Sequence, residues 1–145
     1  MNPCWDSRGR WLPLIEPALA YVDYFCPNQE EGLQLTGETG PPAIADRLHQ
    51  TGVQTVIVKL GPAGCYVDGP EGAFSSPGFV VRAIDTTGAG DCFQAAFLAA
   101  LCRGNNLQHA ARFANAAAAL STLGMGGGDS APTLQRVEEF LQGHA

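Results

Sequence analysis

The stretch that decides the fold is the segment 85–91, DTTGAGD, which runs directly into the apolar segment 92–101, CFQAAFLAAL. Gly88 and Gly90 can adopt backbone conformations closed to other residues, so that consecutive N–H groups converge on one point. A helix expected from about Asp91 to Leu101 would add its dipole and its unpaired N-terminal donors. The sequence therefore predicts an anion hole at this turn, formed with Ala89 between the two glycines.

Asp91 lies at the start of this predicted helix. Its carboxylate is placed to accept a proton from an attacking hydroxyl while a phosphoryl group is transferred. The same residues also fit a plain turn, in which Asp91 only caps the helix and the glycines only redirect the chain. Residue chemistry leaves both interpretations open. A Walker A loop is excluded, since GxxxxGK[ST] occurs nowhere in the chain.

The remaining pattern indicates an α/β fold with a mixed sheet. Apolar runs at Tyr24–Cys26 and Thr55–Leu60 predict two buried strands, and the helical pattern between them predicts a parallel crossover. Three short runs, 64–69, 72–76 and 79–85, are separated by Gly and Pro and predict antiparallel hairpins. Helices are expected at about 10–22, 29–35, 42–50, 91–101, 107–123 and 134–142. The first of these should bury one stripe, made of Trp11, Leu14, Ile15, Ala18, Leu19 and Val22.

Composition excludes several classes of partner. The 145 residues suit one domain, and 8 basic against 14 acidic side chains give a net charge of −6. This balance argues against nucleic acid and anionic membrane surfaces as partners. No apolar run reaches the length of about 20 residues that spans a bilayer, so we expect a cytoplasmic protein. Lys59 is the only lysine in the chain.

The five cysteines show no CxxC spacing, which argues against a zinc site or a disulfide framework. We expect them to be reduced and mostly buried as small apolar side chains. They are Cys4, Cys26, Cys65, Cys92 and Cys102.

Four motifs together resemble the PfkB carbohydrate kinases, the ribokinase-like family. Residues 85–101 look like the second signature of that family, and Asn28–Glu31 (NQEE) resembles its N-x-x-E motif. Lys59–Gly64 (KLGPAG) is similar to its K-x-G-x-x-G nucleotide turn, and Phe113–Ser121 (FANAAAALS) to its adenine-side helix. The four occur in the order of the family, and the resemblance covers nearly the whole chain.

The resemblance implies a three-layer α/β/α ribokinase-like fold with a mixed, mostly parallel sheet. It implies that Asp91 is the catalytic base and contacts the acceptor hydroxyl, while Gly88, Ala89 and Gly90 form the anion hole. ATP and magnesium are the implied cofactors, with Glu31 holding magnesium indirectly. The implied nucleotide-binding residues are Asn28, Glu31, Lys59, Gly61, Gly64 and Asn115.

Local chemistry offers a plainer role for several of these residues. Asn28 fits a helix N-cap and Glu31 a first-turn acid, and these roles are favoured when the family match is set aside. The small side chains of the segment 113–121 equally allow tight helix packing. Lys59 also fits a side chain that extends its stem over an ordinary hairpin.

The resemblance also implies a site for a monovalent cation such as potassium. Met125 and the run 126–128 depart from the commoner ending of the family in this loop. The implied ligands are Asp85, Thr87, Ser121, Gly124, Gly126 and Ser130.

The match is to the C-terminal half of the family domain. We therefore expect residues 1–145 to be the nucleotide-binding half of a PfkB-type domain that begins inside the fold, without the N-terminal strands and the lid. The implied activity transfers the γ-phosphate of ATP to a sugar hydroxyl, with little or no activity in this chain alone and a homodimer for the full-length enzyme. The alternatives are a nucleoside kinase of the same fold and a non-catalytic nucleotide-binding or interaction fragment.

Overall fold

The computed structural model describes residues 1–3 and 6–144. The chain divides into two compact units. The first comprises Met1–Leu60 with Cys65–Ser75, and the second comprises Gly61–Gly64 with Ser76–Ala145.

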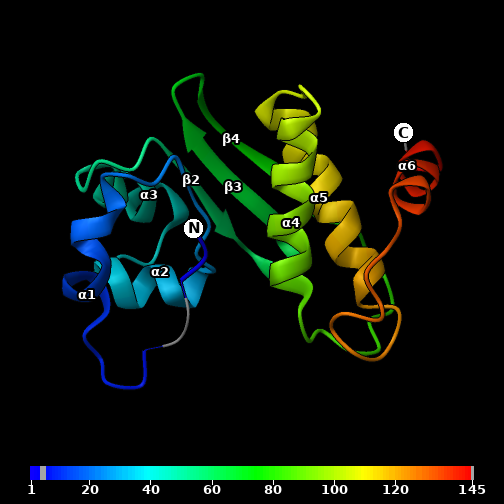
Figure 1. The fold of residues 1–145 in the computed structure, drawn as a ribbon, viewed down its shortest axis with the longest axis horizontal. Coiled ribbons are helices and arrows are strands. Elements are labelled where there is room, and N and C mark those ends of the chain that lie inside the picture. Colours follow the sequence, from blue (N-terminus) through cyan, green and yellow to red (C-terminus); the bar gives the residue numbers. More distant parts are fainter. Residues whose placement is uncertain (4–5, 145) are drawn as a thin grey trace. The chain divides into compact units, whose positions relative to one another are not determined.

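The first unit contains three helices and most of a four-stranded sheet (Figure 1). Its helices are α1 (Trp11–Leu19), α2 (Gln29–Thr36) and α3 (Pro41–His49). The strands β1 (Tyr24–Phe25), β2 (Thr55–Lys59), β3 (Gly64–Gly69) and β4 (Gly72–Pro77) lie in the order β1-β2-β3-β4. β1 is parallel to β2, with Tyr24 opposite Thr55, whereas β2 is antiparallel to β3, with Lys59 opposite Cys65. The predicted crossover and the mixed sheet are confirmed.

The core of this unit forms where the helices pack on β1 and β2. Phe25, Val56 and Val58 of the strands have no exposed surface, and neither do Ile44 and Leu48 of α3. Burying one such side chain stabilises the fold by about 1.5–3 kcal/mol. The near-continuous burial of β2 agrees with the β-branched run in its sequence.

The stripe predicted for α1 is wrong in part. Leu12 and Leu19, seven residues apart, are the buried positions of this helix, and Leu14 is 48% exposed. Trp11 and Ile15 are only partly buried at the edge of the core. Leu19 is buried as predicted, and Trp11, Ile15 and Val22 pack against the core, so the predicted stripe is wrong only at the exposed residues Leu14 and Ala18.

The second unit is mainly helical. It contains the short 3₁₀ turn η1 (Gly61–Ala63) and the helices α4 (Ala89–Cys102), α5 (Leu107–Ser121) and α6 (Leu134–Gln142). α4 and α5 lie side by side, and α6 packs against α5 (Figure 1). Nine of the fifteen residues of α5 are buried, because its alanines allow neighbouring segments to approach closely.

The third predicted hairpin run, 79–85, forms no strand. Val80 is fully exposed, so the apolar residues of this run do not form a buried face. At the end of the run, the N–H groups of Ile84 and Asp85 both donate to the carbonyl of Thr122, at 2.7 and 3.2 Å. The C-terminal end of α5 therefore takes the hydrogen bonds that a neighbouring strand would have taken.

Among the described residues, no helix is long and apolar enough to cross a bilayer. Among the described cysteines, Cys26 and Cys65 are buried and Cys92 is partly buried. Cys102, in the last turn of α4, is exposed and is the exception to the expectation that the cysteines are mostly buried. Cys4 lies outside the described residues.

The cysteines should differ sharply in reactivity in the folded chain. Burial raises the pKa of the Cys26 thiol to about 11, so it is protonated at pH 8 and shielded from reagent. We expect a thiol reagent at pH 8 to modify Cys102 at least roughly 100-fold faster than Cys26 or Cys65, as measured by peptide mass spectrometry. Denaturant should remove the difference, and equal labelling without denaturant would contradict the burial.

Candidate functional site

The N-terminal end of α4 is built on Gly88. Gly88 is the N-cap with φ of 75°, and a β-carbon placed on it would lie 2.9 Å from the α-carbon of Gly127. Both the conformation and the close approach of the backbones require glycine. Gly90 lies inside the helix without a positive φ, so the predicted special conformation is confirmed for Gly88 and wrong for Gly90. α4 begins at Ala89, two residues before the start at Asp91 that the sequence predicts.

The helix end carries donors and an acid side by side. The first intrahelical bond runs from the N–H of Cys92 to the carbonyl of Gly88, at 2.9 Å. The N–H of Ala89 donates to the carbonyl of Thr86 at 3.2 Å. The N–H of Gly90 belongs to the first turn of the helix, before the first intrahelical hydrogen bond. Asp91 is the acidic residue of this first turn and is exposed. The arrangement can bring an anion and a carboxylate to the same helix end.

Asp85 holds the turn before α4 against the loop after α5. Its two carboxylate oxygens accept from the N–H groups of Thr87, at 2.9 Å, and of Gly126, at 3.0 Å. Donation from Thr87 first, and then from Gly126, holds the pKa of the Asp85 carboxyl below its usual value. This partly exposed carboxylate therefore acts as a clamp between two backbone segments.

Five of the six predicted cation ligands meet around this clamp. Besides Asp85, Thr87 and Gly126, the hydroxyl of Ser130 donates to the carbonyl of Gly126, and Gly124 lies close to Ser130. The hydroxyl of Ser121 instead donates to the carbonyl of Ala118 in its own helix, at 2.8 Å. Carboxylate, carbonyl and hydroxyl oxygens suit a hard cation. The hydrogen bonds already connect the loop, so the cation stays a prediction.

In the first unit, the predicted residues Asn28, Glu31 and Lys59 lie together. Asn28 and Lys59 form an isolated parallel bridge just beyond β1 and β2, where ligands commonly bind in open α/β sheets. The side chain of Asn28 accepts from the N–H of Glu31 at 2.8 Å, and the Glu31 carboxylate accepts from the N–H of Asn28 at 2.7 Å. This is a capping box, so the plainer role that local chemistry favoured is observed.

Two contacts bear on the cofactors predicted for this strand edge. The Lys59 ammonium donates to the side-chain oxygen of Asn2 at 2.7 Å. The side-chain oxygen of Asn28 and one carboxylate oxygen of Glu31 are hydrogen-bonded within the capping box. One carboxylate and one amide oxygen fit magnesium when the ion keeps most of its water and is held indirectly. The nucleotide and magnesium roles of these residues stay predictions.

The two glycines of the turn 61–64 are needed for different reasons. Both have positive φ, 58° at Gly61 and 98° at Gly64. A β-carbon at Gly61 would meet nothing within 4 Å, so this position leaves open space for an approaching group. A β-carbon at Gly64 would lie 2.1 Å from the carbonyl oxygen of Ser76, so packing within the protein already explains this glycine.

Asn115 lies on α5 and is buried, with 6% of its surface exposed. Its amide nitrogen donates to the carbonyl and hydroxyl oxygens of Ser76, both at 3.1 Å, and to the carbonyl of Pro77 at 3.3 Å. The side chain is thus directed at the end of β4. Its predicted contact with the nucleotide stays a prediction.

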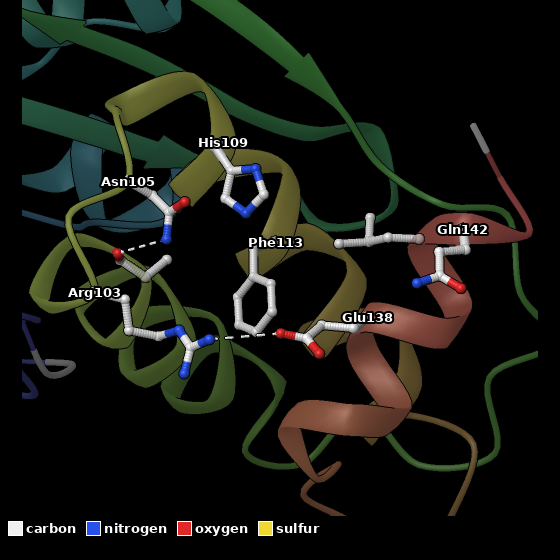
Figure 2. A pocket seen from close by; sticks show the side chains of 8 residues that line it. Arg103, Asn105, His109, Phe113, Glu138 and Gln142 are labelled. Atoms are coloured by element: carbon white, nitrogen blue, oxygen red, sulfur yellow. Dashed lines mark hydrogen bonds and ion pairs between the residues drawn. The ribbon is translucent and has the colours of Figure 1, made fainter.

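A pocket of about 370 Å³ lies in the second unit, among α4, α5 and α6 (Figure 2). Its charged groups, Arg103 and Glu138, face each other at 3.6 Å, and His109 stacks beside Phe113. None of the predicted site residues lines it, and sequence reasoning did not point to it. In the part of the chain that the structure describes, no three His, Cys, Asp or Glu side chains are placed to hold a metal together.

Comparison with known proteins identifies the family. Residues 1–134 match the family described as pfkB family carbohydrate kinase. The chain belongs to this family. The mixed α/β fold of this PfkB chain also matches solved ribokinase structures, which confirms the predicted fold family.

Three relatives give the extent of the match. Ribokinase of Haemophilus influenzae is 37% identical over 134 residues, which cover 89% of this chain and 44% of the relative. A crystal structure of a putative ribokinase II from E. coli with ATP and Mg²⁺ has a TM-score of 0.89 at 28% identity, covering 99% of this chain and 48% of the other. Arabidopsis thaliana ribokinase with ribose and ATP has a TM-score of 0.81 at 33% identity, covering 88% and 43%. The PfkB chain spans less than half of each relative.

The demand for glycine at position 88 can be tested against a matched glycine. Gly88→Ala should lower the free energy of unfolding by more than about 2 kcal/mol, because a strained φ and a backbone clash act together. Gly104→Ala should cost only about 1 kcal/mol, since Gly104 has φ of 83° with nothing within 4 Å. Urea unfolding of the two variants measures both values, and equal losses would contradict the contact with Gly127.

The Asp85 clamp should make the free energy of unfolding depend on pH in the acid range. Because the folded-state pKa of Asp85 lies below the ordinary value of 3.8, its stabilisation is complete above that pH and is lost as the pH falls through the lower folded pKa. Asp85→Asn should therefore destabilise the chain at pH 6 and approach the wild type below pH 3.8 in urea unfolding. Asp129→Asn serves as a control in the same loop. A penalty for Asp85→Asn that does not change with pH would argue against the clamp.

Proposed function

We propose that this chain carries the nucleotide-binding and catalytic part of an ATP-dependent phosphotransferase that acts on a sugar hydroxyl. The observation that carries the proposal is the N-terminal end of α4, where Gly88 requires a positive φ and Asp91 lies in the first turn. Family membership supports the class of reaction. The Arabidopsis relative is complexed with ribose and ATP, and these two ligands support the two substrate classes.

In the proposed reaction, Asp91 accepts the proton of the acceptor hydroxyl as its oxygen attacks the γ-phosphorus. The bond from that phosphorus to the bridging oxygen breaks, and ADP leaves with the electron pair. The N-terminal end of α4, with Gly88, Ala89 and Gly90, stabilises the negative charge on the transferring group. The helix dipole adds to this effect because its positive end lies at the same place.

The other predicted residues serve the nucleotide in this proposal. Lys59 supplies a cation beside the phosphates, and Gly61 leaves space for the nucleotide to approach the backbone. Asn28 and Glu31 hold magnesium through water, and the ion when bound neutralises phosphate charge. The E. coli relative is in complex with ATP and Mg²⁺, which supports this pair of cofactors. A monovalent cation at the Asp85 clamp is a further part of the proposal.

A non-catalytic nucleotide-binding fragment is the second candidate. The observation that favours it is the coverage, since the chain spans 44% of the Haemophilus ribokinase. A kinase must position the acceptor hydroxyl in line with the phosphorus, and contacts from the rest of the domain would contribute to that positioning. We therefore expect the 145-residue chain to bind ATP and to transfer little or no phosphate by itself.

Binding and transfer should separate at Asp91. Calorimetry with Mg·ATP should give the wild type and Asp91→Ala affinities that agree within about twofold, because a base acts on the acceptor proton and not on the nucleotide. Any transfer from γ-labelled ATP to ribose should fall by roughly 10²–10⁴-fold in Asp91→Ala. Glu139→Ala, which removes an exposed acid from α6, serves as the control.

Three outcomes would each count against one of these expectations. A wild-type chain that fails to bind Mg·ATP contradicts the nucleotide site. Robust phosphorylation of ribose by the 145-residue chain contradicts the expectation that it lacks acceptor contacts, and full transfer by Asp91→Ala contradicts the role of the base.

A further inference from the structure

The amide of Asn115 makes an unusual set of contacts for a residue in the middle of a helix. It reaches out of α5 and donates to three oxygens of a single short segment, Ser76–Pro77. Ser76 is itself buried, with 7% of its surface exposed. Hydrogen bonds to buried carbonyl groups matter because leaving such a group unpaired is costly. Asn115 therefore fixes the place where β4 ends.

The segment held by Asn115 packs directly against the turn 61–64. The N–H of Gly78 donates to the carbonyl of Ala63 at 3.1 Å. A β-carbon on Gly78 would lie 2.3 Å from the carbonyl oxygen of Pro62, and one on Gly64 would lie 2.1 Å from that of Ser76. The two backbones therefore touch with no side chain between them. A shift of the segment 76–78 must move the turn as well.

We propose that Asn115 is a positioning residue, which acts on the nucleotide turn 61–64 through the segment 76–78. The proposal rests on the proposed function, in which this turn lies against the nucleotide. It differs from the expectation that Asn115 itself contacts the nucleotide, because the amide nitrogen is directed at the end of β4. All of these residues belong to the second unit, so the chain of contacts is contained within one compact body.

The variants are chosen to change the hydrogen bonds that Asn115 donates to Ser76 and Pro77. Asn115→Ala removes the donor and leaves the oxygens of Ser76 and Pro77 without it. Asn115→Asp keeps the size but turns a donor into an acceptor that faces two carbonyl oxygens. Asn115→Ser is a milder change that keeps one small donor. Asn105→Ala is the matched control, since Asn105 also donates from its amide nitrogen to a backbone carbonyl, that of Ala100, at 3.0 Å.

Hydrogen exchange of the 145-residue chain tests the positioning directly. In Asn115→Ala and Asn115→Asp, the amide of Gly78 should exchange roughly tenfold faster than in the wild type, because its bond to Ala63 is no longer held in place. The amide of Val137 in α6 should not change, and Asn105→Ala should leave Gly78 as it is. If the first two variants unfold, Asn115→Ser is used, with an expected effect in the same direction.

A second measurement asks whether the turn matters to the nucleotide. The dissociation constant for Mg·ATP should rise roughly tenfold in the Asn115 variants, and Ser76→Ala should give a smaller rise of the same kind. In the double variant Asn115→Ala/Ser76→Ala, the serine change should add nothing, because its effect passes through the same bond.

The outcomes separate this proposal from the proposed function. Unchanged exchange at Gly78 in folded Asn115 variants overturns the positioning role. Faster exchange with unchanged ATP affinity overturns the link from the turn to the nucleotide. If the wild type binds no Mg·ATP, the proposed function fails, and exchange at Gly78 alone then decides whether Asn115 positions the turn.

Discussion

The second unit depends on the close approach of two backbone segments at Gly88 and Gly127. A β-carbon at Gly88 would lie 2.9 Å from the α-carbon of Gly127, so the contact exists only because neither residue has a side chain. The same contact fixes where α4 begins, since Gly88 is its N-cap. Asp85 then adds one hydrogen bond across the same pair of segments, from the N–H of Gly126, and one within its own turn, from the N–H of Thr87. The helix end that the proposed chemistry needs is held mainly by this backbone packing.

Much of the fold was predictable because local signals were strong. The sequence Asn28 to Gly37 contains both ends of α2, and the structure shows the capping box at one end and a left-handed glycine at the other. Thr55–Lys59 is a β-branched run that is typical of the interior of a sheet. The run 79–85 looked similar but forms no strand, because the carbonyl of Thr122 pairs with its last N–H groups. That competition comes from a residue far along the chain, which no local pattern reveals.

For the candidate site, the sequence predicted which residues lie near one another better than it predicted which atoms they contact. Motif spacing placed Asn28, Glu31 and Lys59 at one strand edge, and the structure brings them together. Sequence could not show that the amide of Asn115 is directed at Ser76, because that contact joins residues 39 positions apart. The motif also assigned Gly64 a role toward a ligand where packing against Ser76 already demands glycine. Such distinctions depend on which atoms the fold brings together.

The solitary lysine has a practical consequence for work on this chain. Lys59 donates to the side chain of Asn2, and the α-amino group of Met1 donates to the carbonyl of Tyr24. These two groups are the only amines that the 145 residues offer to acylating reagents. Coupling through amines, whether to a surface or to a dye, would therefore modify Lys59 or the α-amino group of Met1, and attachment through the exposed thiol of Cys102 avoids the proposed phosphate-side residue.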